Sequence, residues 1–91
     1  MSLKKQLYNY LKARPNEWVH KSDLSHFAES LGFMGENGTR RTRELVNENP
    51  ERIEVKLEST KEHGKPAFYR YVPSQYEVFH AKMQSNNYQL I

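Results

Sequence analysis

The sequence predicts a small α+β fold in which three helices and a short strand precede a β-hairpin and a last helix. The prediction rests on the spacing of apolar residues. They recur at helical intervals in the first half of the chain, alternate with charged residues after Pro50, and return to helical intervals after Pro73. With 91 residues there is room for one small core. We therefore expect one domain over residues 1–73, followed by a helix and tail over residues 74–91.

The first helix is expected from Leu3 to about Ala13, because Leu7 and Leu11 continue the helical spacing and leave the lysines on other faces. Pro15 ends it, since the residue before a proline avoids helical angles and proline cannot donate a backbone hydrogen bond.

A short extended segment at residues 17–20 leads to the second helix. Ser22 is expected to cap the N-terminus of that helix, which then runs from Asp23 to Leu31. Gly32 follows at the position where a left-handed conformation costs glycine little, so the chain can turn there.

The third helix is expected to begin between Glu36 and Thr39 and to end near Glu48, with Pro50 as the stop signal. A helical wheel places four residues inward, namely Gly38, Thr42, Leu45 and Val46. Glycine and threonine contribute little apolar surface to a core. We therefore expect a loosely held helix, kept in place by its two aliphatic residues, whose first turn tightens on a partner.

The hairpin is expected from two runs of strand-forming residues at 52–58 and 67–72, separated by a polar loop. In the first run Ile53, Val55 and Leu57 should face inward. Aromatic residues nearby are assigned to the sheet and core: Trp18, Tyr69 and Tyr71.

Ser74 and Glu77 form a capping box, which predicts the start of the last helix. Tyr76, Phe79 and Met83 would share one face of it.

Three segments, SDLSHFAESLG, GENGTRRTREL and IEVKLESTKEHGKPAFYRYV, follow one another at residues 22–32, 35–45 and 53–72. In this order they resemble the second helix, the recognition helix and the wing of the winged helix-turn-helix superfamily of small bacterial, archaeal and phage DNA-binding proteins. The resemblance implies a winged helix-turn-helix fold and a sequence-specific transcriptional regulator that binds double-stranded DNA in the major groove.

The third helix carries the residues best suited to reading DNA. Arg40 and Arg43 point outward with Asn47 behind them, and Thr39 and Arg41 flank that face. An arginine fork can bond guanine, an asparagine can pair with adenine, and threonine can bind phosphate. On a short helix, however, arginines also pair with nearby acids and only solvate the surface. The acids within reach are Glu36, Glu44 and Glu48.

The loop between the hairpin strands offers Lys61, His63 and Lys65 to a phosphate or the minor groove, although Glu62 opposes this. The last helix either pairs with its counterpart in a homodimer, as DNA-binding domains of this type often do on inverted half-sites, or covers the first helix of its own chain.

The net charge of +3 is weak evidence for a nucleic-acid partner, because residues 1–21 carry +4 and the other seventy residues sum to about −1. A second interpretation therefore remains open, in which the chain is a winged-helix module that binds protein and does not read DNA.

Other chemistry has little support. Four scattered histidines and no cysteine do not make a metal site, and no phosphate loop or nucleophile motif is visible. We expect no cofactor, no metal and no enzymatic activity. No apolar run reaches the roughly 18 residues of a membrane span, and no signal peptide is evident, so the expected location is the cytoplasm.

Overall fold

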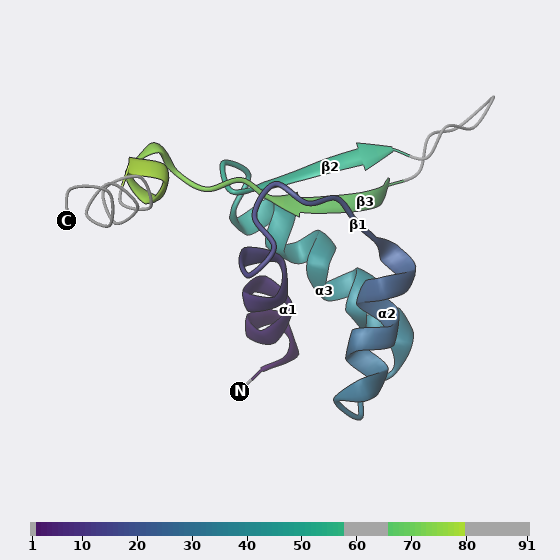
Figure 1. Ribbon diagram of the computed structural model, residues 1–91. Helices are drawn as coiled ribbons and strands as arrows, with labels where there is room; N and C mark the ends of the chain where they lie inside the picture. Colours follow the sequence, from purple (N-terminus) through teal and green to yellow (C-terminus); the bar gives the residue numbers. More distant parts are fainter. Residues whose placement is uncertain (1, 58–65, 80–91) are drawn as a thin grey trace.

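Three helices lie on one face of a three-stranded antiparallel sheet in the computed structural model, which describes residues 2–57 and 66–79 (Figure 1). The elements are α1 (Leu3–Lys12), β1 (Val19–His20), α2 (Lys21–Ser30), α3 (Gly35–Glu48), β2 (Ile53–Leu57) and β3 (Pro66–Tyr71), and residues 75–79 are helical as well. The predicted α+β class and the order of the elements are confirmed. In this part of the chain no helix is both long and apolar enough to cross a bilayer.

The helix α2 begins at Lys21, two residues before the predicted start, and its N-cap is His20 instead of Ser22. His20 ends β1 in an extended conformation, and its Nδ1 accepts a hydrogen bond of 3.1 Å from the backbone N–H of Ser22. The helix α2 therefore begins directly after β1, with no loop residues between them. A sequence pattern for caps misses this arrangement because histidine is not among the usual capping residues.

The helix α3 begins at Gly35, also earlier than predicted, and it packs closely against α2. The side facing the core consists of the fully buried Thr42, the buried Leu45 and Gly38, with Val46 partly buried. A Cβ atom on Gly38 would lie only 2.3 Å from the carbonyl oxygen of Leu24. The small inward residues thus bring α3 close to α2, and the tightening of its first turn on a partner stays a prediction.

The sheet has the order β1-β3-β2, with β3 in the middle. Tyr69 of β3 pairs with Val19 on one side and Val55 on the other, and both Tyr69 and Tyr71 are buried against the helices, as predicted. Trp18 is half-buried.

Leu57 does not face the core as predicted, because its side chain is 56% exposed. The register of β2 and β3 shifts between Lys56 and Leu57, so Leu57 pairs with Pro66. This shift breaks the alternation of inward and outward side chains at the end of the strand.

The capping box before the last helical segment is confirmed. Glu77 donates its backbone N–H to the Ser74 hydroxyl at 3.1 Å, while its carboxylate accepts a hydrogen bond of 2.7 Å from the hydroxyl of Tyr71. Residues 75–79 extend away from the helical layer, and the side chains of Tyr76 and Phe79 are 71% and 59% exposed (Figure 1). This segment does not cover α1. Met83 lies outside the described residues.

Candidate nucleic-acid interface

The outward side of α3 carries a stripe formed by Arg40, Arg43 and Asn47, all exposed. Their spacing of three and four residues places them one above the other along the helix. The buried residues Gly38, Thr42 and Leu45 occupy other positions of the same helix. The predicted division of α3 into an inward and an outward side is therefore confirmed.

The two arginines of the stripe form no ion pair or hydrogen bond within residues 2–57 and 66–79. In particular, Arg40 does not pair with Glu44, although the two stand four residues apart. Among these residues, nothing therefore occupies the five donors of either guanidinium group.

Arg41 belongs to a different surface. Its guanidinium binds Glu44, which also lies 3.6 Å from the Lys4 ammonium of α1. Lys4 in turn forms an ion pair of 2.8 Å with Glu48. We call these four residues the α1–α3 ion network. Arg41 is thus engaged by an acid of its own helix, next to Lys4 of α1, and does not flank the stripe.

The ion network shifts the pKa values of its members. The hydrogen bond from Arg41 holds the pKa of Glu44 below its ordinary value, and the hydrogen bond to Glu48 raises the pKa of Lys4. Because these groups lie near the surface, each pair adds little to stability by itself. Lys4 is the member that links α1 to α3, through Glu44 and Glu48.

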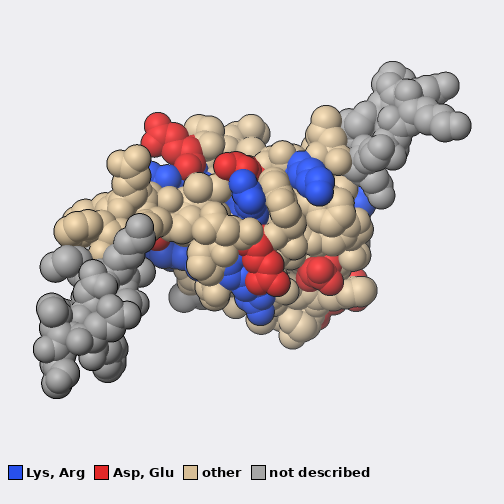
Figure 2. Space-filling model, turned by 45° about the horizontal axis from the view of Figure 1, so that its top comes forward, with Lys and Arg blue, Asp and Glu red and all other residues tan. Residues whose placement is uncertain are grey.

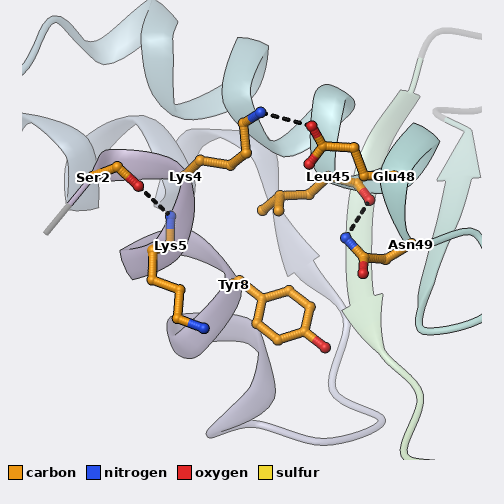
Figure 3. Close-up of a pocket in the computed structure, with 7 residues that line it drawn as sticks. All are labelled: Ser2, Lys4, Lys5, Tyr8, Leu45, Glu48 and Asn49. Carbon is orange, nitrogen blue, oxygen red and sulfur yellow. Dashed lines mark hydrogen bonds and ion pairs between the residues drawn. The ribbon is translucent and has the colours of Figure 1, made fainter.

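A hollow lies beside this network, at the junction of α1 with the C-terminal end of α3. Figure 3 shows Lys4 reaching from α1 to Glu48 of α3, with Lys5 and Tyr8 on the same side of the hollow. The residues that line it are Ser2, Lys4, Lys5, Tyr8, Leu45, Glu48 and Asn49. It contains no nucleophile paired with a base. Within the described ranges, no three histidine, aspartate or glutamate side chains are grouped as metal ligands would be.

Thr39 is half-buried between α2 and α3, where its hydroxyl lies 3.4 Å from the hydroxyl of Ser25. It therefore joins the two helices at the border of the stripe. The other predicted contacts, Lys61, His63 and Lys65, fall outside the residues that the structure describes.

A second cluster, in which basic side chains lie over aromatic rings on the sheet, was not predicted from the sequence. Arg70 of β3 lies with its guanidinium carbon 4.4 Å from the ring centre of Trp18, and the Lys56 ammonium lies 5.4 Å from the ring centre of Phe68. These contacts are on the side of the sheet away from the helices, because Tyr69 and Tyr71 occupy the other side. The alternation of Phe68 and Arg70 with these buried tyrosines was the sequence signal for it.

The charge on the surface is mixed. In the view of Figure 2, acidic and basic side chains of the described residues are interspersed, without one large region of a single sign. Any attraction for nucleic acid therefore depends on local groups such as the stripe and not on a general positive field.

Comparisons with known protein families, with curated proteins and with solved structures find no match. The class that the structure defines is a small α+β domain with helices on one face of a three-stranded antiparallel sheet.

Proposed function

We propose that this protein is a winged helix-turn-helix DNA-binding protein, a small cytoplasmic transcriptional regulator that reads the major groove of double-stranded DNA with α3. The observation that carries the proposal is the stripe of Arg40, Arg43 and Asn47, which is exposed and in which neither arginine is paired within the described residues. The order of helices and strands supports it, because a helix pair followed by a hairpin is the arrangement of that superfamily.

The chemistry of the stripe suits base edges. Each arginine can donate two hydrogen bonds to the O6 and N7 atoms of guanine, and Asn47 can pair with adenine. A good bidentate contact contributes about 1–3 kcal/mol of discrimination against a wrong base. Three side chains in one line along a helix could therefore read a short sequence.

The packing of α3 supports the same role. Gly38 brings the helix against α2, Thr39 joins the two helices, and the α1–α3 ion network holds the other side. A helix positioned in this way needs no backbone rearrangement to present its arginines, so ordering on binding falls mainly on their side chains. In this proposal Lys61, His63 and Lys65 would contact the DNA backbone beside α3.

The helical segment at residues 75–79 supports a homodimer. Its exposed Tyr76, Val78 and Phe79 offer apolar surface, and the hydrogen bond from Tyr71 to Glu77 attaches its first turn to the domain. Two copies joined there would place two α3 helices on inverted half-sites. The dimer then makes twice as many contacts with DNA as one copy does.

The test is a fluorescence titration of the full chain against random duplexes across a salt series. We expect binding that falls steeply as salt rises, since phosphate contacts release counterions. Sequencing of the retained duplexes should give a preferred site. A folded protein that binds no duplex at low salt would overturn the proposal.

A protein-binding module is the second candidate, and one observation favours it. Leu31, Phe33 and Met34 at the turn between α2 and α3 are 37%, 40% and 66% exposed. Such neighbouring apolar side chains are typical of contact surfaces for proteins. Substitution of Met34 by serine should leave DNA affinity unchanged if the stripe alone makes the contacts that matter.

A further inference from the structure

The strand β2 is an open edge of the sheet. It pairs only with β3, and among the described residues no strand lies on its other side (Figure 1). An edge strand presents a row of unpaired backbone donors and acceptors, and it is a template for pairing with another chain. The question is which chain β2 fits.

The hydrogen bonds between β2 and its neighbours show which backbone groups face the open edge. The N–H of Val72 donates to the carbonyl of Arg52 at 2.7 Å, so this carbonyl faces β3. The N–H groups of Arg52 and Ile53 both donate to the carbonyl of Asn49 at 3.0 Å and not to β3. Because successive residues of an antiparallel strand alternate in this respect, both backbone groups of Val55 face the open edge.

The sequence of β2 is complementary to itself in charge. It reads Ile-Glu-Val-Lys-Leu, with Val55 at the centre. If two copies of this strand run antiparallel and cross at Val55, Glu54 of each copy stands opposite Lys56 of the other. Ile53 then stands opposite Leu57. Opposite charges placed across from one another stabilise a strand pair, while like charges destabilise it.

We propose that a second copy of this chain pairs with β2 along its open edge, in a two-fold antiparallel contact centred on Val55. The hydrogen-bonding geometry and the charge pattern select the same register independently. In an antiparallel pair, residues that exchange both backbone hydrogen bonds stand directly opposite one another, as the two Val55 residues do here. A wholly acidic or wholly basic partner strand would leave one charge of β2 facing a like charge.

The side chains of the edge can take part in this contact. Both nitrogens that Arg70 offers to Glu54 bond the same carboxylate oxygen, Oε2, at 2.8 and 3.1 Å. The other oxygen remains available to Lys56 of the second copy. Lys56 is exposed, and in the dimer it would turn from the rings of Phe68 and Trp18 toward that oxygen. The contact would also cover Leu57, which is 56% exposed in the single chain.

This contact is separate from the helical segment at residues 75–79 and does not depend on DNA binding. Its specific readout is amide hydrogen exchange at Val55 in the full chain, measured over a range of protein concentration. Exchange should slow as concentration rises, because the N–H of Val55 gains an acceptor only in the dimer. A dimer formed through residues 75–79 alone would leave Val55 unprotected. That result would overturn this proposal while leaving the proposed function intact.

Charge reversal gives the second test, with sedimentation equilibrium beside the exchange measurement. Glu54→Lys and Lys56→Glu should each weaken the protection of Val55 and the association by about tenfold or more, since like charges then oppose one another at both ends of the contact. An equimolar mixture of the two variants restores an acid opposite a base at every position, so protection should return.

The matched control is Glu51→Lys, the same change of charge in the exposed turn before β2. It should associate like the unchanged protein. Thermal melting identifies any variant that fails to fold, and the mixture remains informative because only folded chains can restore each other's contact. If both single reversals associate as strongly as the unchanged chain, the proposed contact does not exist.

Discussion

The α-carbon of Gly38 faces the backbone carbonyl of Leu24 so closely that a Cβ atom there would lie 2.3 Å from the oxygen. This contact between α3 and α2 sets how near the two helices approach. The neighbouring atoms are backbone, with the carbonyl carbon of Leu24 at 2.8 Å from the same position. Rotation of a side chain therefore cannot relieve the overlap.

Gly38→Ala should destabilise the protein, although alanine is the better helix former by about 1 kcal/mol. To avoid the overlap between the new Cβ atom and the backbone of Leu24, α3 and α2 must move apart. Such overpacking of a well-packed interior costs about 1–3 kcal/mol of stability. Urea denaturation measures the difference. Glu36→Ala on the exposed side of α3 is the control and should change stability by less than about 0.5 kcal/mol. A more stable Gly38→Ala protein would contradict the observed packing.

His20→Ala should lower the free energy of unfolding by about 1 kcal/mol, since the N-cap of α2 is lost. His20→Asn keeps an acceptor at that position and should recover part of the loss. Ser22→Ala distinguishes this structure from the sequence-based assignment of the cap. It should cost clearly less than His20→Ala, because within the described ranges the hydroxyl of Ser22 bonds the His20 ring and no helix N–H group. Thermal denaturation of the three variants decides whether His20 or Ser22 is the N-cap of α2.

Tyr69→Phe should leave the protein as stable or make it more stable by about 1 kcal/mol, because the hydroxyl of Tyr69 is buried without a hydrogen-bond partner within the described residues. Burial also raises the pKa of this hydroxyl. Because the pKa of Tyr69 is higher in the folded protein than in the unfolded chain, this group does not lower the free energy of unfolding below about pH 10, the pKa in the unfolded chain. Above that pH the unfolded chain loses the proton first, so the free energy of unfolding falls as pH rises. The variant should therefore show a smaller fall of stability above pH 10 in urea titrations.

Tyr71→Phe should raise the pKa of Glu77. The hydrogen bond from the Tyr71 hydroxyl is the largest cause that holds this pKa below its ordinary value, and the backbone of Ser74 adds to it. Because the pKa of Glu77 is lower in the folded protein than in the unfolded chain, its carboxylate stabilises the fold at pH values above the unfolded pKa. This contribution is lost as pH falls through the pKa of the folded protein. Carboxyl titration by NMR measures the change. The control is Tyr8→Phe, which leaves the Tyr71 hydroxyl in place and should move Glu77 much less.

Arg43→Ala should weaken binding to a selected DNA site by about 1–3 kcal/mol and relax the preference at one base pair. Arg41→Ala removes the same charge from the same helix but from the α1–α3 ion network. We expect it to change thermal stability and not the preferred base. Fluorescence titration against the site and its single-base variants separates the two effects. Equal loss of base preference in both variants would contradict the assignment of the stripe.

Several features could be predicted from the sequence because they depend on neighbouring residues. The helices α1 and α3 follow from the spacing of apolar side chains, and the start of the last helix follows from Ser74 and Glu77, three positions apart. The outward position of Arg40 and Arg43 follows from the helical period alone.

Other features depend on residues that are far apart in the chain, and only the tertiary structure decided them. Gly38 looked like a weak core residue, yet it is the point where α3 meets the backbone of α2. Arg41 was a candidate DNA contact with an acidic partner as the alternative, and the structure shows it bound to Glu44, which also lies beside Lys4 of α1. Local spacing determines which side of a helix a residue occupies. What stands opposite that side is determined by packing, because the partner comes from another segment of the chain.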